Sequence, residues 1–240
     1  MELEEIKYLV ENKRFTELKN KLKDMNSADI SEILDELDDV ESVIIVFRLL
    51  DKEKAGITFS HMESDMREKL IHAFTDRELK NVLDELFMDD TVDLIEEMPS
   101  NVVPKILKAI PKEDRKIVNE LLKYPDDSAG SIMTTEFIDL KENMTVEEAL
   151  KRIRKIGTDS ETIYTCYVLN EERILKGIIN IKDILLSKKE TTIGTLMETN
   201  IISVNTLEDQ EEVAKMFDKY DYFALPVVDH ENRLVGIITV

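Results

Sequence analysis

Apolar residues recur every twelve positions through the first half of the chain, and this spacing restricts the fold more than any other feature. The residues in this series are Leu50, Met62, Phe74, Leu86, Met98, Ile110 and Leu122. Polar or proline-containing segments follow most of them, so each unit has room for one short helix and a tight turn. A helix that short cannot bury its apolar face alone, and neighbouring units must stack. We therefore predict an all-α superhelix of short helices over residues 1–123, with an irregular helical bundle as the alternative.

Two of the turns carry signals for the start of a helix. Thr75 and Glu78 have the spacing of a capping box, in which each side chain binds the backbone N–H of the other residue. Pro111 suits the first turn of a helix, where its missing N–H would have no intrahelical partner. We expect one helix to begin at each of these places.

The pattern changes after Tyr124–Gly130, where proline and glycine bracket small polar residues. Strand-like and helical segments then follow in β-α-β-β-α order. The strand-like segments are Phe137–Leu140, Ile163–Leu169 and Ile174–Ile181, and the helical segments are Val146–Ile156, capped by Thr145, and Lys182–Ser187. The second half of the chain is therefore predicted to be α/β.

The β-α-β-β-α unit occurs twice. Met133 and Ile138 correspond to Met197 and Ile202, 64 positions later, and Gly177 corresponds to Gly236, 59 positions later. The predicted organisation is a helical domain over 1–123, a joint over 124–131, a first repeat over 132–190 and a second repeat over 191–240. The second repeat stops inside its last strand, before a closing helix, so we expect this chain to be a truncated piece of a longer protein.

Composition excludes several classes of function. The chain has 32 basic and 52 acidic residues, a net charge of −20, which disfavours nucleic acid and favours divalent cations. No apolar run is long enough to span a membrane, and the N-terminus does not resemble a signal peptide. The single cysteine, Cys166, rules out an internal disulfide. The six glycines and three histidines form no phosphate-binding or zinc-protease motif, so we do not expect an enzyme.

Two windows of the helical half, residues 24–47 and 81–104, contain no basic residue at all. Their acidic residues are Asp24, Asp29, Glu32, Asp35, Glu36, Asp38, Asp39 and Glu41 in the first window and Asp84, Glu85, Asp89, Asp90, Asp93, Glu96 and Glu97 in the second. Asp89 and Asp93 are four residues apart, so on a helix both carboxylates project from one face and repel each other unless a cation lies between them. The alternative is an acidic surface that only solvates the protein.

The tandem unit, with Ile132-Met133-Thr134 before the first copy and Gly177–Asp183 closing it, resembles a pair of CBS domains. Tyr124–Phe137, together with the array of short helices and Asp209–Ala214, resembles the cytosolic portion of the MgtE family of magnesium channels. The resemblance implies a Mg²⁺-sensing regulatory region at the cytoplasmic face of the cell membrane. It also implies a homodimer joined through the CBS domains and a transmembrane pore domain as a further partner.

The resemblance places metal-bridging carboxylates at Asp89 and Asp93 of the helical domain and at Glu211 and Asp221 of the second CBS domain. Asp218 lies near Asp221 and could add an oxygen. It implies that the acidic faces of the two domains repel each other at low Mg²⁺, and that bound Mg²⁺ bridges them and compacts the dimer. In the family this compact state closes the pore. Surface charge with no ligand is the alternative for each of these carboxylates.

Many CBS pairs bind adenine nucleotides such as ATP, with an aspartate at the start of the closing helix holding the ribose hydroxyls. Asp183 matches that aspartate by resemblance, although Asn180 stands where a threonine or serine is usual. The alternative function is therefore an adenine-nucleotide-sensing CBS module with the helical array as a docking platform. A scaffold without any ligand is the third hypothesis.

Overall fold

The computed structural model describes residues 2–37 and 39–239, so Asp38 of the first acidic window and Val240 lie outside the described residues. The chain forms two compact units. The first unit contains the residues up to Leu86 together with Asp90–Lys116, and the second contains Phe87–Asp89 together with the residues from Ile117 onward. We call them the helical unit and the CBS unit.

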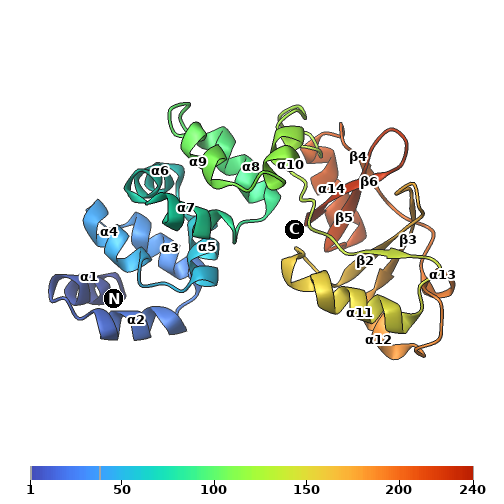
Figure 1. Ribbon diagram of the computed structural model, residues 1–240, viewed down its shortest axis with the longest axis horizontal. Coiled ribbons are helices and arrows are strands. Elements are labelled where there is room, and N and C mark those ends of the chain that lie inside the picture. Colours follow the sequence, from blue (N-terminus) through green and yellow to red (C-terminus); the bar gives the residue numbers. More distant parts are fainter. Residues whose placement is uncertain (1, 38, 240) are drawn as a thin grey trace. The chain divides into compact units, whose positions relative to one another are not determined.

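Short helices make up the first part of the chain (Figure 1). They are α1 (Glu2–Glu11), α2 (Phe15–Asp24), α3 (Ser27–Asp35), α4 (Val40–Phe47), α5 (Lys52–His61), α6 (Ser64–Ala73), α7 (Asp76–Leu83), α8 (Met88–Glu97), α9 (Val103–Ala109) and α10 (Asp114–Leu121). Alternate helices pack together, because α3 contacts α5, α5 contacts α7 and α7 contacts α9, while α4 contacts α6. The prediction of stacked short helices is confirmed, although these contacts join alternate helices rather than neighbours along the chain.

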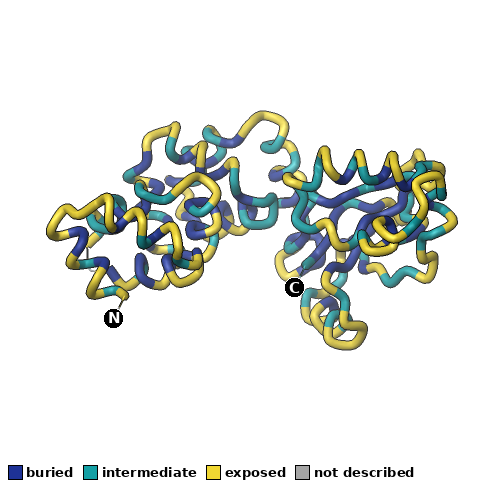
Figure 2. Tube along the Cα trace, turned by 90° about the horizontal axis from the view of Figure 1, so that it is seen from below, coloured by how far each residue is buried: buried dark blue, intermediate teal, exposed yellow. Residues whose placement is uncertain are grey.

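The residues of the twelve-residue series follow the ends of these helices by one to three residues. Met62, Phe74, Leu86, Met98 and Ile110 are buried, and the two ends of the series, Leu50 and Leu122, are half-buried. Short buried stretches therefore alternate with exposed ones along the array, as Figure 2 shows.

The two predicted helix starts have different outcomes. The Thr75 hydroxyl accepts from the Glu78 amide (3.2 Å) and the Glu78 carboxylate accepts from the Thr75 amide (2.9 Å), which confirms the capping box. The prediction at Pro111 is wrong by three residues, because α10 begins at Asp114. Residues 112–113 form a turn, and Pro111 lies before it, where its carbonyl accepts from the Arg115 amide (2.9 Å).

The remainder of the chain contains one copy of the predicted β-α-β-β-α unit and, among the described residues, the β-α-β-β part of a second copy. The first copy has β1 (Asp139–Lys141), α11 (Val146–Ile156), the 3₁₀ turn η1 (Gly157–Asp159), β2 (Thr165–Leu169), β3 (Leu175–Asn180) and α12 (Ile181–Leu186). The short helix α13 (Ile193–Leu196) lies at the start of the second repeat. The second copy has β4 (Val204–Asn205), α14 (Gln210–Tyr220), β5 (Ala224–Val228) and β6 (Leu234–Thr239). Each copy forms a three-stranded sheet, β1-β2-β3 or β4-β5-β6, in which the first pair of strands is parallel and the second antiparallel.

The strand boundaries differ slightly from the predicted ones. β1 begins two residues after Phe137, because Phe137 packs between the repeats, with its ring centroid 5.8 Å from that of Tyr167. β2 likewise begins at Thr165 rather than Ile163. Ile181 starts α12 instead of ending β3.

The two repeats complete each other's sheets. Thr134, before the first strand of the first repeat, pairs with Ile237 of β6 through two backbone bonds of 2.9 Å. Glu198, before the first strand of the second repeat, pairs in the same way with Ile178 of β3 at 2.8 and 3.0 Å. Gly177 and Gly236 allow this close approach, since a Cβ atom would lie 2.5 Å from the Met197 sulfur at Gly177 and 2.6 Å from the Met133 sulfur at Gly236.

The segment predicted as a joint over 124–131 is held by the second repeat. The Ala129 amide donates to the Glu208 carbonyl (2.7 Å), and the Gly130 amide donates to the Thr206 carbonyl (2.8 Å). Residues 128–131 are buried, whereas residues 125–127 are exposed. This segment therefore has a buried stretch and an exposed stretch, and the exposed Asp127 accepts from the amide and the side chain of Gln210 (both 2.8 Å).

Across the described residues, no helix combines the length and the apolar content that crossing a bilayer requires.

Candidate functional site

The predicted carboxylates Asp89 and Asp93 both lie on α8, one turn apart, as their spacing indicated. Asp89 is half-buried in the first turn and Asp93 is exposed. Asp90 and Glu97 extend the row, since they lie three residues before and four residues after Asp93. The helix therefore presents a row of negative charge along one face, with no basic residue of its own in the last turn.

A cation from another helix lies beside this row. Arg67 of α6 is only 8% exposed and forms an ion pair with Glu97. The Ser64 hydroxyl also donates to the Glu97 carboxylate (2.5 Å). The sequence analysis missed Arg67, and the only signal for it was that a window without basic residues must find a counter-charge elsewhere in the fold.

Burial and repulsion raise pKa values in this row. Burial raises the pKa of Asp90, while Arg67 and His61 act in the opposite direction. Partial burial raises the pKa of Asp93, and repulsion from Asp90 and Glu97 raises it further, again opposed by Arg67. Asp93 keeps a solvent-exposed surface, so a hydrated cation can reach it.

The carboxylates predicted on the second CBS domain do not lie together. Glu211 is in the first turn of α14, and Asp221 follows its last residue in a left-handed conformation (φ 52°). Ten residues of helix separate them by about 15 Å, so no single ion with ligand bonds of about 2.1 Å can bind both. Glu211 shares a cavity of about 540 Å³ with Asp218, which lies two turns further along the same face.

Within the described residues, no group of three or more histidine, cysteine, aspartate or glutamate side chains is arranged to hold a metal ion. Magnesium requires few protein ligands, because it keeps several of its waters.

Asp183, the residue matched to nucleotide binding, lies in the first turn of α12 and lines a cavity of about 520 Å³. The other lining residues are Tyr164, Thr165, Asn180, Ile181, Lys182 and Phe223. Tyr164 and Phe223 are 67% and 78% exposed. Exposed aromatic faces can stack on a base, a carboxylate can accept from sugar hydroxyls, and a lysine can neutralise phosphate.

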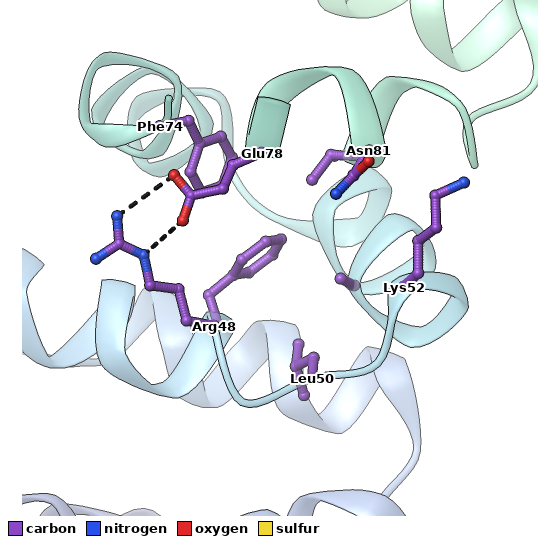
Figure 3. Close-up of a pocket in the computed structure, with 9 residues that line it drawn as sticks. Arg48, Leu50, Lys52, Phe74, Glu78 and Asn81 are labelled. Carbon is purple, nitrogen blue, oxygen red and sulfur yellow. Dashed lines mark hydrogen bonds and ion pairs between the residues drawn. The ribbon is translucent and has the colours of Figure 1, made fainter. Parts of the chain in front are cut away.

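A third cavity, of about 220 Å³, lies in the helical unit and is lined by none of the predicted residues (Figure 3). Phe47 and Phe74 contribute its apolar surface. Its charged rim is paired within the protein, since Arg48 donates to Glu78 at 2.8 and 3.4 Å and Lys52 donates to Glu85 at 2.5 Å. This arrangement leaves little charge for an ionic ligand.

Glu136 is a further residue that the sequence analysis missed. Its carboxylate accepts from the Thr134 hydroxyl and from the Met88 amide (3.4 Å) at the start of α8. Burial raises its pKa against the effect of these hydrogen bonds. A buried carboxylate of this kind holds a proton more readily than one in water.

Comparison with known families divides the chain into the same kinds of domain. Residues 25–127 match the model of the MgtE intracellular N domain. Residues 129–190 and 193–240 each match the CBS domain. The prediction of a helical domain followed by a CBS pair is thereby confirmed.

Two magnesium transporters named MgtE are similar to nearly the whole chain. The protein from Thermus thermophilus is 34% identical over 93% of this chain and 50% of its own length. The protein from Bacillus subtilis is 30% identical over 91% of this chain and 51% of its own length. The chain thus spans about half the length of these relatives.

Two solved structures share the fold across the whole chain. The cytosolic domain of the Mg²⁺ channel MgtE in complex with ATP has a TM-score of 0.87 and 34% identity, covering 92% of this chain and 90% of that one. The soluble part of a magnesium transporter has a TM-score of 0.89 and 28% identity, covering 99% and 93%. On this combined evidence, the chain belongs to the MgtE family, with the architecture of its cytosolic region, an MgtE N domain followed by a CBS pair.

Proposed function

We propose that this chain is the Mg²⁺-sensing regulatory region of a magnesium transporter and acts without enzymatic chemistry. The observation that carries the proposal is the acidic row of α8, which gathers Asp89, Asp90, Asp93 and Glu97 on one helix. Burial raises the pKa of Asp90, and burial together with repulsion from Asp90 and Glu97 raises the pKa of Asp93. Such a row gains free energy when a divalent cation binds. The relatives named above are magnesium transporters, which supports Mg²⁺ as that cation.

In this proposal, Mg²⁺ binds Asp89 and Asp93 on α8, Glu211 on α14 and Asp221 just after α14, each ion keeping most of its waters. At least two ions are needed, because α14 separates its two carboxylates. At low Mg²⁺ the acidic faces repel, by about 1 kcal/mol per close pair of charges in water. Bound Mg²⁺ bridges the faces, compacts a homodimer and closes the transmembrane pore of the full-length protein at the cytoplasmic face of the membrane.

Limited proteolysis tests the proposal, because Pro125–Asp127 is exposed next to a buried, paired segment. The chain is digested with a protease that cleaves before aspartate, during titration with MgCl₂ or with NaCl of equal ionic strength. We expect protection at millimolar Mg²⁺ only, and loss of that protection in Asp89→Ala/Asp93→Ala.

Glu32→Ala/Glu36→Ala is the matched control, since it removes two exposed carboxylates with the same four-residue spacing at the end of α3. It should keep the protection by Mg²⁺. Equal cleavage in the two salts, or equal loss of protection in both double variants, would contradict the proposal.

Nucleotide binding is a second candidate function, supported by the cavity around Asp183 and by a similar structure that was solved with ATP. In this hypothesis Asp183 accepts from the ribose, and Phe223 and Tyr164 contact the base. Isothermal titration with ATP should show binding that Asp183→Ala weakens about tenfold, as expected for the loss of a charged hydrogen bond. Asp159→Ala, an exposed aspartate of the same repeat outside the cavity, should bind like the wild type.

The predicted homodimer has a candidate surface on α12. Leu185 and Leu186 are 61% and 77% exposed, an unusual pair of apolar side chains on a domain this acidic. Sedimentation of the wild type should give a dimer, and Leu185→Asp/Leu186→Asp should give a monomer. A dimer that survives this change would place the interface elsewhere.

A further inference from the structure

Arg67 is a buried cation among carboxylates from two other helices. Arginine is almost never this far from solvent without a partner, and Arg67 is 8% exposed. Its Nη2 atom forms the ion pair with Glu97 and also donates to the Ser64 hydroxyl (3.2 Å). Among the described residues its Nε atom has no hydrogen-bond partner, so the guanidinium retains donor capacity inside the fold.

More negative charge surrounds Arg67 than it can neutralise. Asp35 comes from α3, and Asp90, Asp93 and Glu97 come from α8. Arg67 pairs directly with Glu97, and its charge favours the ionised form of Asp35, Asp90 and Asp93. One fixed positive charge therefore serves four carboxylates from two helices.

We infer that Arg67 is the internal counter-cation of the α8 acidic row and sets the Mg²⁺ concentration at which that row responds. The inference rests on the proposed function, because it concerns how tightly the same carboxylates bind Mg²⁺. Guanidinium stays protonated in proteins, so its repulsion of an approaching divalent ion is permanent. The same charge holds α6 and α8 together when no metal is bound, which lets the row stay folded at low Mg²⁺.

The test compares the Mg²⁺ affinity of charge-removing and charge-preserving variants by isothermal titration, with matched NaCl as the background. Arg67→Met should bind Mg²⁺ about tenfold more tightly, as expected for the loss of one nearby positive charge partly screened by solvent. Arg67→Lys keeps the charge and should stay close to the wild type. Lys69→Met, an exposed cation on the same helix, removes the same net charge and should change nothing.

Removing one member of a buried ion pair can unfold a protein. Arg67→Gln therefore accompanies Arg67→Met, since its amide can still donate to Glu97 and Ser64 without carrying a charge. It should show the same tightening. A gain in affinity shared by Arg67→Met and Arg67→Gln, and absent from Arg67→Lys, cannot come from lost packing.

Failure of this inference can be told apart from failure of the proposed function. If the wild type binds Mg²⁺ and the charge-removing variants bind it equally well, Arg67 is only a structural ion pair and the proposed function stands. If Arg67→Lys shifts as far as Arg67→Met, the charge is not responsible and the inference is wrong. If neither the wild type nor any variant binds Mg²⁺, both are overturned.

Discussion

The helical unit joins its elements mainly through side chains, whereas the CBS unit joins its repeats through the backbone. In the helical unit, Lys54 of α5 donates to the carbonyls of Leu22, Lys23 and Met25 at the end of α2 (3.1, 2.8 and 2.6 Å). Lys105 of α9 does the same for the end of α6. In the CBS unit, Thr134 and Glu198 pair with strands of the opposite repeat by backbone bonds, across glycines.

This difference predicts which amino-acid substitutions each unit tolerates. Replacing a flexible lysine that caps a helix should reduce the free energy of unfolding only moderately, because water can donate some of the hydrogen bonds that the lysine donated to the carbonyls. A glycine against a backbone carbonyl cannot be enlarged without moving the strand that it faces. We therefore expect the glycines at these backbone pairings to be sensitive to a single added methyl group.

Gly236→Ala should give the largest effect, a loss of about 2–3 kcal/mol in the free energy of unfolding, as for other overpacked cores. The added Cβ would lie 2.6 Å from the Met133 sulfur and 2.7 Å from the Thr134 carbonyl oxygen. The methionine can move, but the carbonyl belongs to the paired backbone. Urea unfolding of the purified variant measures the change.

Gly157→Ala is the control for that experiment, because it adds the same methyl group where the nearest atom is a side-chain carbon of Ile163 at 3.1 Å. Its backbone is right-handed (φ −70°), so alanine adopts it without strain. The control should lie within about 0.5 kcal/mol of the wild type. Equal destabilisation by both variants would contradict the idea that a methyl group is tolerated less well against paired backbone than against a side chain.

Lys105→Met should destabilise the helical unit by about 1–2 kcal/mol, because the carbonyls of Ile71 and Phe74 lose their donor and the end of α6 loses a favourable charge. Lys108→Met is the comparison, since Lys108 makes only an ion pair with Asp76 that is exposed to solvent and screened by it, so its loss should destabilise the unit less. Thermal unfolding of both variants gives the order. If Lys108→Met lowers the melting temperature more than Lys105→Met does, the bonds from Lys105 to the end of α6 do not contribute to the stability of the helical unit as predicted.

The pH dependence of stability in Glu136→Gln tests the effect of a buried carboxylate in the CBS unit. The folded-state pKa of Glu136 is raised above its ordinary value of 4.5, because burial disfavours the carboxylate. The folded protein therefore binds the proton more tightly than the unfolded chain, and stability falls as pH rises from about 4.5 towards the raised folded value. The glutamine variant lacks this fall and should be more stable at neutral pH by about 1 kcal/mol or less.

Unfolding free energies of the wild type and Glu136→Gln across pH 4–8 check the sign. The difference in unfolding free energy between the two proteins should grow as pH rises above the unfolded-state pKa of Glu136, and should stay constant above its folded-state pKa. A variant that is less stable than the wild type at neutral pH would mean that the ionised carboxylate, with its bonds to Thr134 and Met88, is the stabilising form.

Tyr167→Phe should give the smallest effect, a gain of about 0.5 kcal/mol or no change. The tyrosine is fully buried between the repeats, and within the described residues its hydroxyl has no hydrogen-bond partner. Phenylalanine keeps the ring contact with Phe137 and removes the unsatisfied group. Tyr164→Phe, at an exposed position, is the control. A clear loss of stability confined to Tyr167→Phe would contradict the prediction and would indicate a buried water bound to the Tyr167 hydroxyl.

Local features were predictable from the sequence where a nearby residue decides them. The capping-box spacing of Thr75 and Glu78 predicted the start of α7, and Thr145 predicted the start of α11. The turn before α10 was mispredicted, since proline fixes its own φ but not the residue at which regular hydrogen bonding begins. The counter-charge Arg67 was not predictable, because it lies thirty residues before Glu97 and nothing local connects them.

The sequence by itself determined the two kinds of domain, the internal repeat, and the presence of Asp89 and Asp93 on one helical face. These follow from periodicity, which the chain imposes wherever a helix or strand forms. Only the tertiary structure decided which charges meet, because ion pairs such as Arg67–Glu97 depend on how separate helices pack. It likewise showed that Glu211 and Asp221 cannot share an ion, since a rigid helix keeps its two ends apart.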